Sequence, residues 1–391
     1  MNKKNNISYG NHYIDNNDIR SVNKSLKSEF ITGGYYNKKF TQDLKKYLNA
    51  KHVTLCSSGT SALHLAFLSI NLKPSDIVIM PAINFIASYN MAKKLGAKIF
   101  LADVNSETGQ MTTQNVEDCI KKNKLKKIKC ILNMFLGGSP ENVVSFFKLK
   151  IKYKCFLIED SCHAFGSKYF YKNKYYIVGS NFHSDISTFS FHPVKSIATG
   201  EGGCLTTRSK KIFERSMIFR NHGMKKNNNK HWDYDVIENG YNYRLNDINA
   251  ALGSSQLKKI NKFISKRNKI VKLYKKELFE LSKFVKFPNY SVNILNCYHL
   301  LIVKIDFKKL NTNKDIFLSY MLKNNIRCQF HYKPIYKFKI FGDNVKPKKN
   351  FPNSEIYFKN CLSLPIFYKL KINDIFYIIK KIKNFVKSKA K

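Results

Sequence analysis

The alternation of short apolar runs with longer helical patterns, from about residue 50 to 210, constrains the fold more than any other feature of this chain. The apolar runs are rich in Ile, Val, Leu and Phe and predict strands at "DIVIM", "KIFLADV", "KIKCILNMF", "KCFLIED", "DISTFSF" and "GGCLTTR". Strands separated by helices are typical of a mostly parallel sheet that is covered on both faces. We therefore expect an α/β protein built on such a sheet.

The last third of the chain predicts a second, smaller unit. Residues 245–281 predict one or two long helices, where the chain crosses between the units. They are followed by a strand "YHLLIVKID", a helix "KDIFLSYMLKNN", a strand "IRCQFHYKPIY" and a basic amphipathic helix "NDIFYIIKKIKNFVKS", which we expect to pack on its own domain. We predict a large domain over 1–250, a smaller C-terminal α+β domain over 251–391, and a mobile loop at "KKNNNK", residues 225–230.

The charge of the chain is large but evenly spread. With 69 basic and 26 acidic residues the formal net charge is +43, and the lysines run from "MNKKNN" to "KSKAK". Binding to nucleic acid needs clustered charge, so we interpret the charge as a compositional bias and expect no nucleic-acid partner. Nine cysteines without a CxxC pair indicate reduced thiols and no zinc site. The polar start and the lack of a long apolar run predict a cytoplasmic protein without membrane contact.

The turn "SSGTS" at 57–61 follows the strand-like "HVTLC" and opens a helical pattern. Ser58 and Thr60 are residue types that cap helix N-termini. The free backbone N–H groups and the positive end of a helix suit a phosphate. A capped helix without any ligand explains the same residues equally well.

Asp160 ends the apolar run of "FLIEDSCHAFG", at the edge where α/β proteins bind ligands. A buried carboxylate there needs a cationic partner. A protonated pyridine nitrogen would serve, and the ionised carboxylate would keep such a ring an effective electron sink. A structural acid or a metal ligand remains the alternative, with His163 as a second ligand, although no third ligand stands at a suitable spacing.

Lys195 lies between the apolar strand "FSFHP" and the glycine turn "TGEGG". Most lysines are solvated, but Gly200, Gly202 and Gly203 allow a close backbone approach or a positive φ directly after this one. A lysine desolvated there would have a lowered pKa. Its neutral amine could then perform Schiff-base chemistry.

Two further segments combine aromatic and polar side chains. Phe85 in "INFIAS" could stack on a flat ring, while Asn242 and Arg244 in "NGYNYRLND" could reach an anion. Core packing explains each of them as well.

These motifs, in this order, resemble the DegT/StrS group of sugar aminotransferases, which are fold type I enzymes dependent on pyridoxal 5'-phosphate. The resemblance spans nearly the whole chain, through "SSGTSALHLA", "IEDSCHAFG", "FSFHPVKSIATGEGG", "RNHG", "YNYRLNDINAALGSSQLKK" and "HYKPIY". "FSFHPVKSIATGEGG" and "HYKPIY" look most like the branch that serves pseudaminic acid synthesis. This likeness implies transfer of an amino group from L-glutamate to carbon 4 of a UDP-linked 4-keto-6-deoxy-N-acetylhexosamine, in a homodimer with shared active sites.

The resemblance also implies roles for individual residues. Lys195 would hold the cofactor, Asp160 would pair with the pyridine nitrogen, and His163 would lie near the ring hydroxyl as a third catalytic residue. Phe85 would stack on the ring. The phosphate ligands would be Gly59, Thr60, Ser61 and Ser190, with Asn242 from the other subunit. The sugar nucleotide would be bound by Tyr9, Glu29, Phe30, Ile31, Thr32, Gln329, Phe330, His331 and Tyr332.

Departures and alternatives remain. "FLGGSP" at 135–140 and Gly59, where close relatives often have alanine, depart from the family pattern, and we expect neither to touch the reaction. A dehydratase subgroup replaces the lysine by histidine, so Lys195 argues against that subgroup. The same chemistry on another nucleotide-linked ketosugar is the first alternative. A catalytically inactive basic regulatory protein with this fold is the second.

Overall fold

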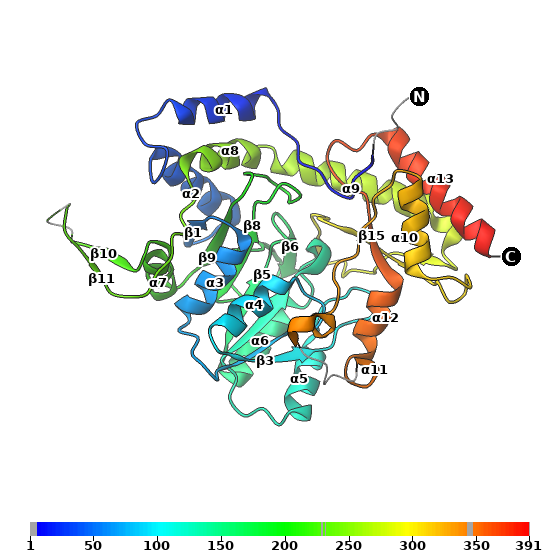
Figure 1. The fold of residues 1–391 in the computed structure, drawn as a ribbon, viewed down its shortest axis with the longest axis horizontal. Coiled ribbons are helices and arrows are strands. Elements are labelled where there is room, and N and C mark those ends of the chain that lie inside the picture. The colour runs from blue at the N-terminus through cyan, green and yellow to red at the C-terminus, as the bar shows by residue number, and fades with distance from the viewer. Residues whose placement is uncertain (1–5, 228–229, 231, 342–346, 391) are drawn as a thin grey trace.

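A seven-stranded sheet forms the centre of the molecule (Figure 1). The structure is a computed structural model that describes residues 6–227, 230, 232–341 and 347–390. The strands follow the order β1-β9-β8-β5-β4-β2-β3, and only β9 runs against the others, so the prediction of a mostly parallel sheet is confirmed. They are β1 (His52–Cys56), β2 (Ile77–Pro81), β3 (Lys98–Ala102), β4 (Cys130–Met134), β5 (Phe156–Asp160), β8 (Ile186–Ser190) and β9 (Gly203–Thr207).

Helices cover both faces of this sheet. One face packs against α3 (Gly59–Ser69), α4 (Ile86–Lys94) and α7 (Lys210–Arg220), and the other against α2 (Tyr35–Leu48), α5 (Thr113–Lys122), α6 (Val143–Tyr153) and α8 (Asp247–Leu257). Successive side chains of a strand point to opposite faces. In β5, Ile158 therefore packs in the α3 cluster, whereas Leu157 packs in the α5 and α6 cluster. Burial on both faces explains why the strands are almost continuously apolar.

The C-terminal part builds a second core around a small antiparallel sheet. Its strands are β12 (Val285–Lys286), β14 (Leu301–Ile305) and β15 (Cys361–Leu364). Its helices are α9 (Ile260–Glu277), α10 (Lys314–Lys323), α11 (Pro347–Asn350), α12 (Pro352–Asn360) and α13 (Ile372–Lys389). The amphipathic α13 buries Ile378, Ile382 and Phe385 in this core, as predicted. None of the helices in the described residues is long and apolar enough to cross a membrane. The boundary at 250/251 stays a prediction.

The predicted strand at residues 326–336 is wrong. Only isolated bridges occur there, from Ile326 to Ile7 and from Gln329 to Ser363, before a short 3-10 turn over Ile335–Lys337. Pro334 cannot donate a hydrogen bond to a neighbouring strand. The segment instead runs along the rim of a cavity with its side chains turned toward it.

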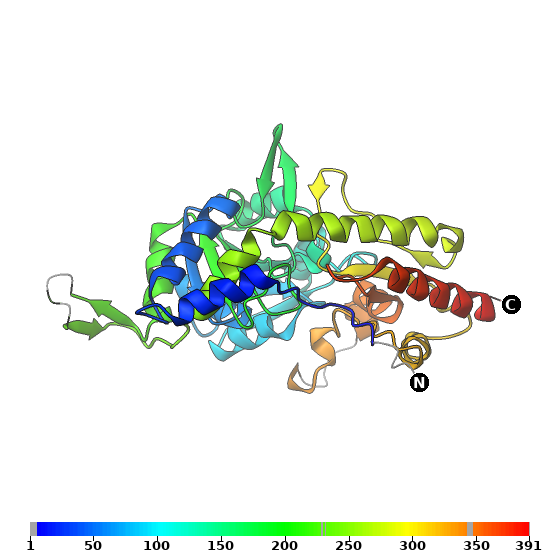
Figure 2. The ribbon, with the colours of Figure 1, turned by 90° about the horizontal axis from the view of Figure 1, so that it is seen from above.

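Two hairpins project from the body (Figure 2). One consists of β6 (Lys168–Tyr171) and β7 (Lys174–Ile177), with β13 (Ile294–Leu295) along its edge. The other consists of β10 (Met224–Lys226) and β11 (Tyr234–Val236) and forms an arm at one end of the molecule. The predicted loop at 225–230 begins inside β10, and its residues 228–229 lie outside the described residues.

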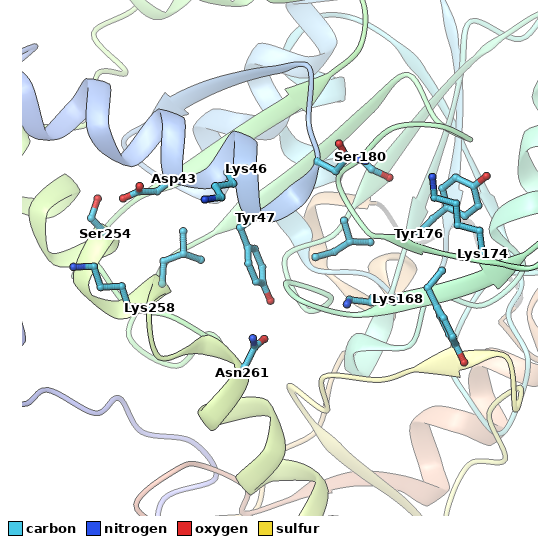
Figure 3. A pocket seen from close by; sticks show the side chains of 14 residues that line it. Asp43, Lys46, Tyr47, Lys168, Lys174, Tyr176, Ser180, Ser254, Lys258 and Asn261 are labelled. Atoms are coloured by element: carbon cyan, nitrogen blue, oxygen red, sulfur yellow. The ribbon is translucent and has the colours of Figure 1, made fainter.

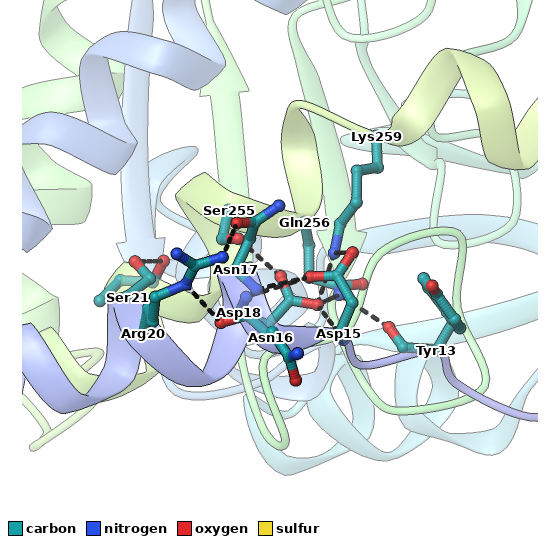
Figure 4. A network of polar contacts seen from close by, with 11 residues as sticks. Tyr13, Asp15, Asn16, Asn17, Asp18, Arg20, Ser21, Ser255, Gln256 and Lys259 are labelled. Atoms are coloured by element: carbon teal, nitrogen blue, oxygen red, sulfur yellow. Dashed lines mark hydrogen bonds and ion pairs between the residues drawn. The ribbon is translucent and has the colours of Figure 1, made fainter.

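A buried carboxylate ties the N-terminal helix α1 (Asn16–Leu26) to the junction of α8 and α9 (Figure 4). Asp18 is fully buried and pairs with Lys259, which begins the turn into α9. Ser255 and Gln256 also donate to Asp18, at 2.6 and 2.7 Å. Because a buried carboxylate stays charged only when it is paired and hydrogen-bonded, this network fixes where α1 lies on the large unit.

Candidate active site

A cavity of about 640 Å³ opens at the carboxyl end of β5 and β8. The start of α3, the residue before α4, the loop after β8 and the segment after residue 328 all contribute to its wall. Twelve of the predicted site residues line it: Tyr9, Gly59, Thr60, Phe85, Asp160, His163, Ser190, Lys195, Gln329, Phe330, His331 and Tyr332. Residues from six separate parts of the sequence thus meet in one place.

The remaining predicted site residues do not line this cavity. Ser61 is buried beside it, where its hydroxyl lies 2.9 Å from those of Ser57 and Ser58. Asn242 and the segment 29–32 are exposed. Since Asn242 was expected from another subunit, one chain does not test that role. The roles of these residues stay predictions.

Asp160 is a buried carboxylate that has no ion-pair partner among the described residues. Its hydrogen-bond donors are the Cys162 N–H at 3.1 Å and the Ser88 hydroxyl at 3.5 Å. Burial raises its pKa, while the positive charge of Lys195 acts in the opposite direction. A cationic ring nitrogen in the cavity would satisfy this carboxylate, so Asp160 fits the pyridine ring of the implied cofactor.

Lys195 reaches the same cavity from the loop after β8. Burial lowers the pKa of its amine, as the sequence context predicted, which favours the neutral nucleophilic form. The glycine turn behind it also follows the prediction. Gly200 adopts φ +82°, and a Cβ at Gly203 would lie 2.4 Å from the Ser58 carbonyl oxygen. The lysine loop therefore packs directly against the start of α3.

The start of α3 presents the predicted phosphate site. Ser58 is the N-cap and accepts a hydrogen bond from the Ser61 N–H at 3.0 Å, which leaves the N–H groups of Gly59 and Thr60 without a partner inside the helix. A Cβ at Gly59 would lie 2.8 Å from the Cβ of Ser190, so glycine lets the helix start meet the end of β8. Two free N–H groups and the Ser190 side chain suit a phosphate.

Glu159, the neighbour of Asp160, belongs to a different environment. It points to the opposite face of β5, where the hydroxyls of Ser187 and Ser184 donate to it at 2.7 and 3.0 Å. Burial raises its pKa to about 7. The strand alternation thus separates one acid that faces the cavity from one that does not.

Glu159→Gln should stabilise the protein above neutral pH. An acid whose folded-state pKa is raised, here from 4.5 to about 7, loses stability as pH rises between these values, because only the unfolded chain ionises freely. The gain for the amide should therefore be small near pH 5 and reach about 3 kcal/mol at most above pH 7. Urea unfolding between pH 5 and 8 measures it. A gain that does not change with pH would contradict the assignment.

Three histidines gather beside the acid and the amine. The His163 ring lies 4.3 Å from that of His299 and 6.3 Å from that of His331, and burial lowers the pKa of all three. His299 was missed by sequence reasoning, although a polar residue directly before the apolar run of β14 was a usable signal. In the described part of the chain, no group of three or more His, Cys, Asp or Glu could hold a metal ion.

A second cavity, of about 560 Å³, lies between α2, the β6–β7 hairpin and the α8–α9 junction (Figure 3). Four lysines line it, Lys46, Lys168, Lys174 and Lys258, and its acid Asp43 already pairs with Lys39 at 2.7 Å. None of the predicted site residues reaches it. The first cavity is therefore the candidate active site.

Comparison with known proteins agrees with this geometry. A family model described as the DegT/DnrJ/EryC1/StrS aminotransferase family matches residues 12–383. The chain belongs to this family. This aminotransferase is also 34% identical over 387 residues to the UDP-4-amino-4,6-dideoxy-N-acetyl-beta-L-altrosamine transaminase of Campylobacter jejuni subsp. jejuni serotype O:23/36 (strain 81-176), covering 96% of this chain and 98% of that protein.

Solved structures of related proteins share its fold. Helicobacter pylori PseC, an aminotransferase involved in the biosynthesis of pseudoaminic acid, superposes with a TM-score of 0.88 at 28% identity, covering 98% of this chain and 100% of that one. The PLP form of Spr1654 from Streptococcus pneumoniae gives a TM-score of 0.87 at 25% identity, covering 98% and 99%. The fold type I prediction is confirmed, and this aminotransferase is a sugar aminotransferase that depends on pyridoxal phosphate.

Proposed function

We propose that the enzyme transfers the amino group of L-glutamate to carbon 4 of a UDP-linked 4-keto-6-deoxy-N-acetylhexosamine, giving a 4-amino sugar nucleotide for pseudaminic acid synthesis. The observation that carries this proposal is the 34% identity, over nearly the full length of both chains, to the Campylobacter jejuni transaminase. The cavity supports it, because a buried acid without an ion pair, a buried amine whose pKa is lowered and a helix start with two free N–H groups lie together.

The residues of the cavity have different roles in this reaction. Bound pyridoxal phosphate supplies the electron sink that stabilises negative charge on carbon during proton removal. Asp160 would pair with the ring nitrogen and supply a negative charge there. The Nζ of Lys195 takes a proton from the α carbon of the donor and returns one at the sugar carbon. The N–H groups of Gly59 and Thr60 would hold the cofactor's phosphate, and this would orient the reacting atoms.

The substrate is tested by amination of a panel of nucleotide ketosugars. Purified enzyme, pyridoxal phosphate and L-glutamate are incubated with UDP-, GDP- and dTDP-linked 4-ketosugars and with a UDP-linked 3-ketosugar, and the amino products are measured by mass spectrometry. We expect the highest kcat/KM for the UDP-linked 4-keto-6-deoxy-N-acetylhexosamine. Turnover of 3-ketosugars alone, or a clear preference for GDP or dTDP, would show that the substrate assignment is wrong.

The active sites are proposed to be shared in a homodimer, with Asn242 reaching the phosphate of the partner subunit's cofactor. The arm β10–β11 carries exposed apolar side chains, among them Tyr234 and Val236, each 55% exposed, which suits a protein contact. Asn242 is exposed on the chain that returns from this arm.

Mixing two inactive variants should restore activity if Asn242 acts across the interface. Asn242→Asp places a negative charge next to the phosphate, and Lys195→Ala removes the amine. A mixed dimer then holds one doubly altered site and one intact site. After co-refolding at equal amounts, we expect roughly a quarter of wild-type activity, from one site in half of the dimers. No recovery, in mixtures that contain the mixed dimer, would place Asn242 in its own subunit's site or in none.

A further inference from the structure

The segment "FLGGSP" at 135–140 lies against the active site, contrary to the expectation from its sequence. Its turn holds Gly137 at φ +78° and Gly138 at φ +107°. A Cβ at Gly138 would lie 2.7 Å from the carbonyl oxygen of His163, so only glycine permits this approach. The Ser167 hydroxyl donates to the Gly138 carbonyl at 2.6 Å and braces the turn. The turn is therefore a rigid support for His163.

The hydrogen bonds of the His163 ring determine its tautomer. The Gly137 N–H faces Nδ1 at 3.4 Å, and a backbone N–H can only donate. Nδ1 is therefore the unprotonated nitrogen, and Nε2 carries the hydrogen. Burial and the nearby charge of Lys195 lower the His163 pKa, which disfavours a ring with two N–H groups.

The Nε2–H group of His163 donates a hydrogen bond to the hydroxyl of Tyr332. The two atoms, Nε2 of His163 and Oη of Tyr332, lie 2.9 Å apart. Because Nε2 donates, Oη accepts, and the hydroxyl hydrogen must find another acceptor. Within the described residues Tyr332 makes no second hydrogen bond. Its ring lies 5.5 Å from that of Phe85, and both line the cavity, so the free hydrogen is available to a bound molecule.

We propose that the Gly137 turn holds His163 in the Nε2–H tautomer, so that His163 acts through Tyr332 and directs the Tyr332 hydroxyl hydrogen to an oxygen of the bound molecules. His163 is then a positioning residue, whereas the resemblance implied a catalytic residue near the ring hydroxyl. Two oxygens could accept this hydrogen bond, the ring oxygen of pyridoxal phosphate and an oxygen of the nucleotide sugar. Only the second rests on the proposed function.

The neighbouring histidines do not provide a competing route. His331 has its Nδ1 2.9 Å from the Ser363 hydroxyl, and Nδ1 of His299 is buried without a hydrogen-bond partner among the described residues. Neither makes a hydrogen bond to Tyr332 there. His299 is thus a matched control, because it is a buried ring in contact with His163 and outside the pathway.

The tautomer is measured directly in the protein without cofactor or substrate. Histidine is labelled with ¹⁵N, and the His163 signals are identified by their loss in His163→Gln. We expect a pyridine-like Nδ1 and a pyrrole-like Nε2 at every pH from 6 to 9. A hydrogen on Nδ1, alone or together with one on Nε2, would overturn the proposal whatever reaction the enzyme performs.

A double-mutant cycle then tests whether His163 acts through Tyr332. The affinity of the apoprotein for pyridoxal phosphate and the KM for the sugar are measured for His163→Leu, Tyr332→Phe and the double variant. Loss of this hydrogen bond should lower the affinity for pyridoxal phosphate or raise the KM for the sugar, by about 10-fold for a neutral acceptor and up to about 100-fold for a charged one. The quantity that changes identifies the acceptor. The double variant should equal Tyr332→Phe alone. Effects that multiply, or no change in either quantity, would overturn the proposal.

Two controls accompany the cycle. His163→Gln keeps an N–H donor and should remain within about threefold of the wild type, since one neutral hydrogen bond replaces another. His299→Leu removes a neighbouring buried ring, and its effect should multiply with that of Tyr332→Phe. Thermal unfolding of each apoprotein shows that the variants compared are folded. The measurement of pyridoxal phosphate affinity needs no sugar, so its result remains valid even if the proposed substrate is wrong.

Discussion

Lys195→Ala should reduce transamination by at least about 10⁴-fold, because one change removes both the covalent attachment point and the acid–base group. The cofactor should still bind, held by Asp160 and the start of α3, so the variant separates binding from chemistry. Turnover of glutamate in a single-turnover assay measures the loss. Borohydride reduction followed by peptide mass spectrometry should place the cofactor on Lys195 in the wild type.

The controls for this prediction use other lysines. Lys195→Arg keeps the positive charge but offers no neutral amine at working pH, and should be as inactive as the alanine variant. Lys258→Ala removes an exposed lysine from the second cavity and should leave turnover unchanged. If reduction labelled another lysine while Lys195 stayed unmodified in loaded protein, the central assignment would be wrong.

Asp160→Asn should lower kcat/KM about 10²- to 10³-fold, in line with the roughly 3–5 kcal/mol lost when one partner of a buried charge pair is removed. The amide leaves the ring nitrogen without its counter-charge, so the ring withdraws electrons less well. Folding of the apoprotein should not suffer, because Asp160 is already a buried acid without an ion pair. The affinity for pyridoxal phosphate and kcat/KM with glutamate are the two measurements.

Glu159→Gln is the matched control for this variant. The two residues are adjacent, both changes turn a buried acid into its amide, and only Asp160 faces the cavity. Equal losses of activity in the two variants would show that acid removal anywhere in β5 disturbs the enzyme. The role of Asp160 at the ring would then lose its support.

The parts of the site that could be predicted are those determined by near neighbours in the sequence. Asp160 ends an apolar strand, Ser58 precedes a helix, and Lys195 precedes a glycine turn, so local pattern and strand direction placed all three. The strand predicted at 326–336 is wrong because distant contacts, not near neighbours, determine the structure of this segment. Its apolar and aromatic residues satisfy a strand pattern, but their burial comes from the cavity wall and from long-range packing.

Contacts between distant segments could not be predicted in this way. Gly137 and His163 are 26 residues apart, and Tyr332 follows 169 residues after His163, so no local pattern reports their hydrogen bonds. Residues 29–32 and Asn242 are exposed, and the partners expected for them are a bound sugar and a second subunit. A single chain therefore gives no information about their partners.

The contact between Gly203 and the Ser58 carbonyl has a consequence for the design of this enzyme. It brings the backbone that follows the lysine loop against the backbone that precedes α3, so the separation between Lys195 and the proposed phosphate site is constrained by contact between main-chain atoms. A side chain at Gly203 would push these two anchors apart and alter that span. An engineer who wants the enzyme to accept a longer or shorter cofactor analogue should therefore begin with this pair of backbone segments.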